Sequence, residues 1–471
     1  MKILIVEDDS EYLKNIQETL AGIRDDIEFT LATNRNSAID CISENFYDLI
    51  VLDLKIPTVL GGLDEEPEHG YAVFEFARQR APGTPLFVLT GSPAESFIEK
   101  LQENTTQVDI WGSGQLASSR FLAKHKYAKF KEIISPYLEG FGKLLDVELQ
   151  GGDDRLSIVD DRILRIFSSK QKAAKCVIRI LSGGLSGAKV VRITLTNETG
   201  AHILEGVAKI GLAPEVASES QRFDAHVIRL EGRATPRKLA LIEYGGGDSS
   251  GIFYSMAVGY ESDAFKIAVL NDEKSASVVK EIKSLTDPWR AGVPEARKDV
   301  KSLRRFAISD EKLEASEPSF PYDWIPQFES RLLQTRYACC HGDLHGMNVL
   351  ASFDGNPLLI DYGDVGVTAA SWDPVTLELS LLFHPDAPLR ESNWPTDNQA
   401  QQWGELDVYL ENCPYPIFVR ACREWAMEVA AGHREVAACA YSYLVRQTKY
   451  TKERERIFAL IVGAKNLFDR G

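Results

Sequence analysis

The sequence predicts two different folds in one chain: an α/β domain with a doubly wound, five-stranded parallel sheet, and after it a two-lobed α+β domain. Near the N-terminus, short apolar runs alternate with amphipathic stretches, which is the pattern of a parallel sheet covered by helices. Near the C-terminus, two short apolar runs have polar loops beside them and long helical stretches after them. The length of 471 residues allows two or three domains.

The first domain is expected at residues 1–145, with strands at 2–6, 29–32, 49–52, 86–89 and 121–124 and helices at 10–20 and 36–44. In such sheets ligands bind beyond the carboxyl ends of the strands, where Glu7, Asp8, Asp53 and Thr90 gather. Converging carboxylates repel one another unless a cation lies between them. We therefore expect a Mg²⁺ site there, with Glu7, Asp8 and Asp53 as ligands.

These residues resemble those of response-regulator receiver domains. Glu7 and Asp8 match the acidic pair of that family, and Asp53, in the run Asp-Leu-Lys-Ile-Pro, matches the phosphoacceptor. The resemblance implies that Thr90 is the switch hydroxyl and Lys124 the phosphate-binding lysine, although Lys126 is a close alternative. It also implies a bacterial two-component phosphorelay, in which a sensor histidine kinase or a phosphotransfer protein phosphorylates Asp53.

Three features depart from that family. The loop after Asp53, residues 58–70, is long and acidic, the segment between Thr90 and Lys124 is expanded, and His125 replaces the usual proline. An apolar stripe along residues 126–149 predicts helices, with a break or kink at Pro136. Such a stripe suits packing on the sheet, signalling or homodimer formation. Residues 146–160 are expected to be a linker or helical junction.

The second domain is expected at residues 161–471, with a small lobe to about 258 and a large lobe from about 259. Its first strands flank a glycine-rich hairpin whose amides could approach phosphates, with candidates at Gly183, Gly184 and Gly187. Lys209 is a lone charge in the next apolar strand. On the helix that follows, Glu219 is the preferred partner for Lys209, with Glu215 as second choice, and Lys209 could also be a plain surface lysine.

Residues 337–364 carry the strongest chemical signal of the second domain. The loop His-Gly-Asp-Leu-His supplies Asp343, Asn348 closes that loop, and Asp361 stands at the exit of the next apolar run. Two carboxylates and an amide beside buried strands suit phosphoryl transfer. One carboxylate can deprotonate a hydroxyl, and the other two groups can hold Mg²⁺ on the phosphates.

This stretch resembles the kinase-like superfamily of aminoglycoside phosphotransferases, on the motif His-Gly-Asp-Leu-His-x-x-Asn followed by Ile-Asp-Tyr-Gly-Asp. The resemblance implies ATP and Mg²⁺ as cofactors, with Asp343 as catalytic base, Asn348 and Asp361 as metal ligands, and Lys209 with Glu219 at the nucleotide. Asp373 would brace the catalytic loop. The same stretch is also similar to a ternary-complex-associated domain of bacterial conflict systems, which would imply a partner protein as target.

Composition excludes several other classes. A net charge of −16 argues against a broad nucleic-acid surface, and no apolar run reaches the roughly 20 residues that span a bilayer. Seven cysteines without metal-site spacing indicate a reduced, cytoplasmic protein without disulfides.

Two functions remain open from the sequence. The first is a response regulator whose output is an ATP-dependent phosphotransferase acting on a small-molecule hydroxyl or a protein. The second is a signalling adaptor in which the kinase-like domain binds nucleotide or a partner without turnover. Intact Asp343, Asn348, Asp361 and Lys209 favour the first, and the divergent glycine loop keeps the second open.

Overall fold

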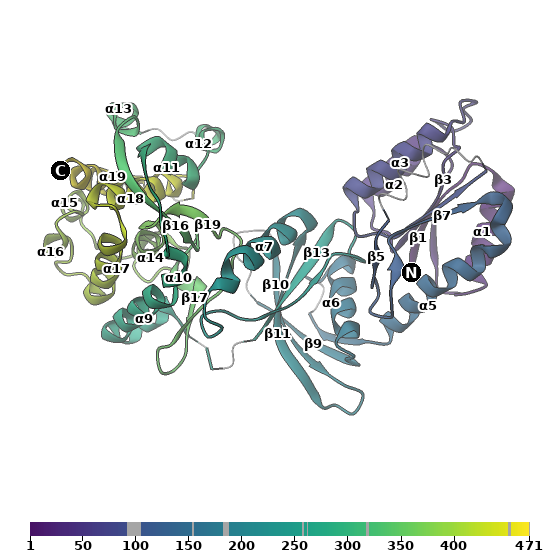
Figure 1. Ribbon diagram of the computed structural model, residues 1–471, viewed down its shortest axis with the longest axis horizontal. Coiled ribbons are helices and arrows are strands. Elements are labelled where there is room, and N and C mark those ends of the chain that lie inside the picture. The colour runs from purple at the N-terminus through teal and green to yellow at the C-terminus, as the bar shows by residue number, and fades with distance from the viewer. Residues whose placement is uncertain are drawn as a thin grey trace. The chain divides into compact units, whose positions relative to one another are not determined.

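The structure, a computed structural model, describes residues 1–91, 105–152, 155–181, 188–256, 259–260, 262–316, 320–450 and 454–470 (Figure 1). These residues form two compact units. The first unit comprises residues 1–220 and 238–256, and the second comprises residues 221–237 and 257–471. The predicted fold class is confirmed: a five-stranded parallel sheet comes first, and mixed α+β structure follows it.

The first sheet has the strand order β2-β1-β3-β4-β7, and every neighbouring pair is parallel. Its strands are β1 (Lys2–Val6), β2 (Glu28–Ala32), β3 (Leu49–Asp53), β4 (Leu86–Thr90) and β7 (Ser119–Ala123). The central strands β3 and β4 are buried along their whole length, as continuous apolar runs require in a sheet covered on both faces.

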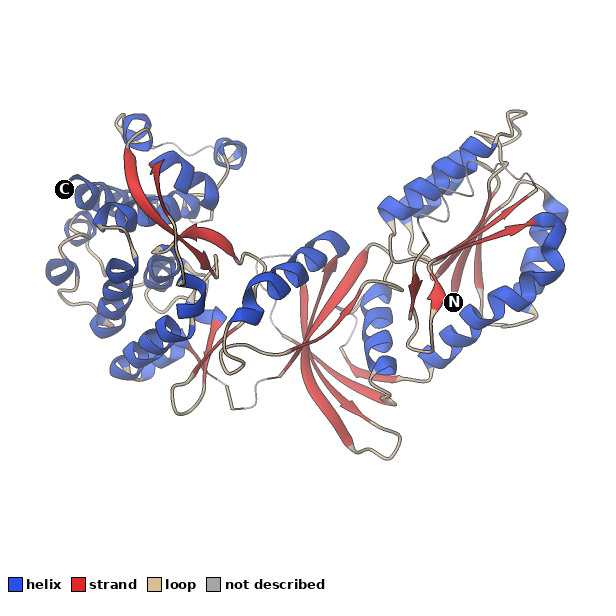
Figure 2. Cartoon of the chain, viewed as in Figure 1, coloured by secondary structure: helices blue, strands red, loops and turns tan. Residues whose placement is uncertain are grey.

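Helices cover both faces of the first sheet (Figure 2). Side chains of α1 (Ser10–Ala21) and α5 (Phe130–Leu145) share one apolar core with the sheet, and those of α2 (Arg35–Glu44) and α3 (Pro67–Arg80) share the other. Asp9 caps α1 and Asn34 caps α2 by accepting backbone N–H groups of the first turn.

The expected break at Pro136 is wrong. After a 3₁₀ segment, η1 (Lys124–Lys129), α5 continues through Pro136 from Phe130 to Leu145. Proline removes one helical N–H, but Pro136 is exposed, so water can serve the carbonyl left without a helical donor. The buried stripe on the opposite side of α5, which includes Phe130, Tyr137 and Phe141, holds the helix on the sheet.

The expanded segment before Lys124 contains a small hairpin of β5 (Gln107–Val108) and β6 (Leu116–Ala117). Trp111 lies in its connection and is completely buried, with its ring edge-on to Phe141 of α5 at 5.4 Å between centroids. This insertion is therefore anchored to α5 by an aromatic contact.

The second sheet has the order β12-β13-β11-β10-β9-β8 and is antiparallel except between β8 and β9. Its strands are β8 (Glu148–Gly151), β9 (Lys175–Ile180), β10 (Lys189–Thr196), β11 (His202–Leu212), β12 (Lys238–Ile242) and β13 (Ser249–Ser255). Helix α6 (Ile158–Lys170) lies between β8 and β9 in the sequence, and α7 (Ala213–His226) follows β11. Much of the predicted junction is thus built into this sheet and its helix.

The two large sheets of the first unit share one core. Ile163, Leu164 and Phe167 of α6 belong to the same apolar cluster as Phe141 and Leu144 of α5. The guanidinium of Arg162 on α6 donates to Asp48, just before β3, at 2.7 Å, and both side chains are almost fully buried. Nearby, Gly83 N donates to Gly247 O at 2.9 Å and Gly245 N donates to Gly83 O at 2.8 Å. The Arg162–Asp48 pair and the backbone bonds of Gly83 with Gly245 and Gly247 are together called the seam.

The second unit is mainly helical, and its described residues include two three-stranded sheets. Before the predicted catalytic stretch come η3 (Val227–Arg229), β14 (Ser262–Asp263), α8 (Ala264–Leu270), α9 (Asp272–Leu285), α10 (Asp287–Arg290), β15 (Glu295–Asp299), α11 (Val300–Ala307), α12 (Asp310–Ala315) and α13 (Ile325–Glu329). That stretch contains β16 (Leu332–Cys340), η4 (Gly346–Asn348), β17 (Val349–Ala351) and β18 (Pro357–Leu359). After it come β19 (Gly366–Ala369), α14 (Trp372–Phe383), α15 (Asp397–Gln401), α16 (Leu406–Tyr409), α17 (Pro416–Val429), α18 (His433–Gln447) and α19 (Arg454–Asp469).

All seven cysteines have free thiols, as the sequence indicated. In the described part of the chain, none of the helices combines the length and apolar character needed to cross a membrane.

The seam generates a prediction on stability. Replacing Arg162 by Met leaves the buried Asp48 carboxylate without its cation, which typically costs about 3–5 kcal/mol. We expect Arg162→Met to lower the urea midpoint of the full chain by a corresponding amount. Arg233→Met removes an exposed arginine and should change the midpoint little. Equal midpoints for the two variants would contradict a structural role for the buried pair.

Candidate functional site

Three carboxylates meet at the carboxyl edge of the first sheet. Glu7 and Asp8 follow β1, Asp53 ends β3, and their nearest oxygen atoms all lie within 4.8 Å of one another. Burial, together with the charge of Asp53, raises the pKa of Glu7 to about 7. Burial also raises the pKa values of Asp53 and Asp8. Carboxylates held this closely are suited to a divalent cation such as Mg²⁺.

Lys124 is the lysine that reaches this acidic cluster. Its Nζ atom lies 2.8 Å from Asp53 Oδ2 and 2.9 Å from Glu7 Oε1, and it stands 4.5 Å from the centre of the Tyr12 ring. Lys126, the alternative, is exposed. Thr90 ends β4 as a buried residue and is paired with Ala123 in the strand ladder, one residue before Lys124.

The long loop after Asp53 is folded back on itself. Ile56 and Glu66 form an antiparallel bridge, Thr58 Oγ1 donates to Asp64 Oδ2 at 2.5 Å, and His69 Nδ1 lies 3.0 Å from Ile56 O. Lys55 pairs with Glu65 at 3.6 Å. The loop is therefore a defined part of the edge that carries Asp53.

In the second sheet, Lys209 pairs with Glu219. The Lys209 Nζ and Glu219 Oε2 atoms are 2.8 Å apart, and both side chains are nearly buried. Tyr254 of β13 donates its hydroxyl to Glu219 Oε1 at 3.0 Å. Glu215, the second choice for this role, is exposed. Gly183, Gly184 and Gly187 lie outside the described residues.

In the second unit, the loop between β16 and β17 is held by Asp373, at the start of α14. The backbone N–H groups of His341 and Gly342 donate to the Asp373 carboxylate at 2.7 and 3.0 Å. Gly342 has φ of +85°, and a Cβ atom there would lie 2.2 Å from Asp364 O, so this position requires glycine. Asp373 therefore braces the loop, as the sequence predicted.

Asp343 follows these braced amides and is partly exposed. Its Oδ1 atom accepts a hydrogen bond from Arg446 of α18 at 3.0 Å, and Asn348 Nδ2 donates to its backbone carbonyl at 2.9 Å. His345 Nε2 lies 3.7 Å from Asp343 Oδ2. Burial lowers the pKa of His345 to about 4, so this ring is neutral at physiological pH and Arg446 supplies the positive charge beside Asp343.

Asp361 adopts a backbone conformation that is rare for a residue with a side chain, with φ of +64°. The residue before it, Ile360, contacts the Asp343 loop through both its N–H and its carbonyl. Ile360 N donates to Asn348 O at 3.1 Å, and His341 Nε2 lies 2.9 Å from Ile360 O. The second unit thus brings the segments of Asp343, Asn348 and Asp361 together. Strain of this kind is concentrated at functional sites.

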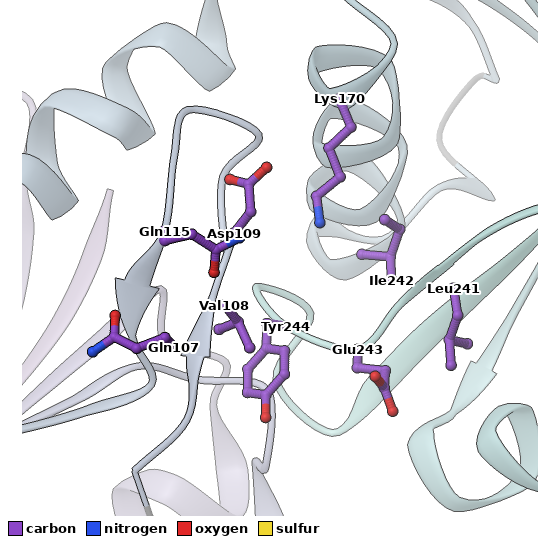
Figure 3. Close-up of a pocket in the computed structure, with 9 residues that line it drawn as sticks. All are labelled: Gln107, Val108, Asp109, Gln115, Lys170, Leu241, Ile242, Glu243 and Tyr244. Atoms are coloured by element: carbon purple, nitrogen blue, oxygen red, sulfur yellow. The ribbon is translucent and has the colours of Figure 1, made fainter.

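A separate pocket of about 280 Å³ lies beside the β5–β6 hairpin (Figure 3). Figure 3 shows the side chains of Lys170 and Asp109 on opposite sides of this space. Its lining residues are Gln107, Val108, Asp109, Gln115, Lys170, Leu241, Ile242, Glu243 and Tyr244. Among the described residues, none of those predicted to bind metal or nucleotide lines it.

Sequence reasoning missed Arg446, Tyr254 and Glu435 as parts of these sites. Glu435, at the other end of α18, is buried and accepts from the backbone of Arg336 and from Ser371. The same helix is therefore fixed to the strand before the Asp343 loop and also contacts Asp343. Only their places as the charged residues on either side of the apolar run at 436–445 hinted at such a role for Glu435 and Arg446.

Comparison with known proteins identifies the first domain. Residues 3–107 match the family model described as response regulator receiver domain. This part of the chain is a receiver domain. It is similar to a receiver domain protein from Methanospirillum hungatei JF-1 at 21% identity, with 30% of this chain and 97% of that chain covered and a TM-score of 0.22. It is also similar to the receiver domain of a sensor histidine kinase from Pseudomonas aeruginosa PAO1, solved with magnesium in its active-site cleft, at 20% identity, with coverages of 29% and 97% and a TM-score of 0.22.

A larger share of the chain is similar to a thermostable mutant of aminoglycoside phosphotransferase APH(4)-Ia in its apo form. The identity is 11%, 56% of this chain and 93% of that chain are covered, and the TM-score is 0.34. No curated protein matches the chain.

The contact of Lys124 with the receiver carboxylates generates a two-sided prediction. Lys124→Met removes a positive charge from the acidic cluster, so Mg²⁺ should bind about tenfold more tightly, since like charges repel. Phosphoryl uptake from acetyl phosphate should fall, because the phosphate loses its cationic partner. Calorimetry and intact-mass analysis measure the two effects. Lys126→Met is the matched control and should change neither quantity. An equal response of both variants would show that Lys124 is not the lysine that contacts the phosphate.

Proposed function

We propose that this chain is a two-component response regulator in which phosphorylation of Asp53 controls an ATP- and Mg²⁺-dependent phosphotransferase. The observation that carries the proposal is that each domain holds a group of side chains suited to phosphoryl transfer. Glu7, Asp8 and Asp53 converge with Lys124 in the receiver, and Asp343 stands on a loop braced by Asp373. A receiver takes its phosphoryl group from a histidine kinase or a phosphotransfer protein, which makes such a protein the expected partner.

The residues of the second domain fit Mg-ATP in the chemistry of their donor groups. Lys209, held by Glu219, supplies a buried cation for nucleotide phosphates. Asn348 donates through its amide nitrogen, so its carbonyl oxygen can serve as a metal ligand beside the Asp361 carboxylate. When bound, Mg²⁺ neutralises charge on the phosphates.

Asp343 has the role of general base in this proposal. It accepts the proton of an acceptor hydroxyl and orients that oxygen toward the phosphoryl group. Asp373 fixes the backbone before Asp343, and Asn348 holds its carbonyl, so the carboxylate starts from a defined position. The acceptor is a small-molecule alcohol or a protein hydroxyl.

One observation favours the second candidate, a signalling adaptor without turnover. Asp343 is already paired with Arg446 at 3.0 Å, so one of its carboxylate oxygens is occupied before an acceptor hydroxyl could bind. In this reading the second domain binds nucleotide or a partner protein under receiver control.

The receiver part of the proposal predicts that Asp53 is the phosphoacceptor. Intact-mass analysis after treatment with acetyl phosphate and Mg²⁺ should show one added phosphoryl group on the wild type. Asp53→Ala should remain unmodified, because the mutant lacks the accepting carboxylate. The control is Asp40→Ala, which removes an exposed carboxylate of α2 and keeps the acidic cluster intact. Equal modification of the wild type and Asp53→Ala would disprove the assignment.

The phosphotransferase part predicts a separation of turnover from binding. Asp343→Asn keeps the shape of the side chain but not its basicity, so turnover should fall about 10²–10⁴-fold while ATP affinity stays nearly unchanged. Asp361→Ala should instead abolish Mg²⁺-dependent ATP binding. Coupled turnover assays and calorimetry distinguish the two losses. Wild-type turnover no higher than that of Asp343→Asn would support the adaptor.

A further inference from the structure

The turn between β12 and β13 contacts the receiver directly. Its Gly245 and Gly247 exchange two backbone hydrogen bonds with Gly83, in the connection between α3 and β4. Beside them, Arg80 Nη1 at the end of α3 lies 3.3 Å from Asp248 Oδ2. Backbone bonds of this kind transmit a displacement well, because no flexible side chain lies between the two segments.

The same turn holds the beginning of α7. Ala213 N, the first residue of that helix, donates to Asp248 O at 2.9 Å. Helix α7 carries Glu219, the partner of Lys209, and Tyr254 of the adjoining strand β13 donates to the same carboxylate. Asp248 therefore contacts the receiver through its side chain and α7 through its carbonyl.

On the receiver side, α3 connects this turn with the phosphoacceptor. Near its start, Gly70 N donates to the carbonyl of Leu54, the residue after Asp53, at 3.0 Å. A Cβ atom on Gly70 would lie 2.3 Å from the Leu54 Cα atom, so helix and loop are in direct backbone contact. Helix α3 has 14 residues, and it extends about 15 Å from Gly70 to Arg80. Figure 1 shows α3 lying along the receiver sheet.

We propose that α3 and the β12–β13 turn couple the phosphorylation state of Asp53 to the position of α7, and thereby to the Lys209–Glu219 pair. This inference deepens the proposed function and rests on it for the role of Asp53. Catalysis in kinases requires an intact lysine–glutamate pair, so a small shift of α7 is enough to change activity. The coupling needs contacts that differ between the phosphorylated and unphosphorylated receiver. The contact of Gly70 with Leu54 is placed to respond, because Leu54 directly follows Asp53.

Gly83 offers a direct way to test the coupling. Its φ is not in the left-handed region, so alanine is allowed by the backbone, but the new Cβ would lie 2.7 Å from Glu243 O and 3.1 Å from Gly247 O. Gly83→Ala is therefore a steric wedge between the receiver and the turn. Gly232→Ala is the matched control, because its Cβ would meet nothing within 4 Å. Arg80→Gln is a second, gentler variant, since it removes only a partly exposed ion pair.

The experiment is hydrogen–deuterium exchange on the full chain, with and without Mg²⁺ and beryllium fluoride, a mimic of the aspartyl phosphate. In the wild type, the mimic should change exchange in the receiver and also at residues 213–220 of α7. In Gly83→Ala the receiver response should persist, while the α7 response should fall at least about threefold. Arg80→Gln should show a smaller reduction, and Gly232→Ala should behave as the wild type.

Two outcomes would overturn the coupling: a wild-type receiver response without any change in α7, or an unaltered α7 response in both Gly83→Ala and Arg80→Gln. A wild type in which the mimic leaves the receiver itself unchanged would count against Asp53 as phosphoacceptor. The coupling is still tested in that case without the mimic. Gly83→Ala alone should then speed exchange at residues 213–220 relative to Gly232→Ala, and equal rates would refute it.

Discussion

The buried contact of Asp48 with Arg162 is the constraint on which the first unit depends. It pins the start of the central strand β3 to helix α6, and the apolar cluster around it continues from α5 into the second sheet. An ion pair in such surroundings gives little net stability but tolerates very few alternative arrangements, because either charge alone would be costly to bury. The pair therefore fixes the position of α6 and its sheet relative to the first sheet. From the sequence, these two sheets were expected to belong to separate domains.

A comparable constraint operates in the second unit, where Asp373 accepts the amides before Asp343. There the carboxylate binds backbone rather than a counter-charge, and burial raises its pKa while the two amides oppose that effect. Both sites use a buried acid to hold a segment in place. In the second unit, the neighbouring acid Asp343 remains partly exposed.

Local pattern was sufficient for the strands of the first sheet and for grouping candidate side chains at its edge. Apolar runs located β1, β3 and β4, and the polar residues directly after them could only lie at one edge of a parallel sheet. The choice of Glu219 over Glu215 followed from helical spacing, since Phe223 turns inward with it. Arg446 could not be found in this way, because it lies 103 residues from Asp343 in the sequence. Likewise, whether Pro136 breaks a helix depends on which side of that helix faces water.

The glycines at the seam also limit which parts of this chain can be exchanged with those of another protein. Cutting after α5 would look like a natural way to exchange one receiver for another, since a strand and a new sheet begin there. A foreign receiver would bring its own residue to the place of Gly83, and any side chain there would collide with the carbonyl of Glu243. It would also have to supply an acid for Arg162. The module that evolution or a protein engineer could transplant intact is therefore the receiver together with the second sheet.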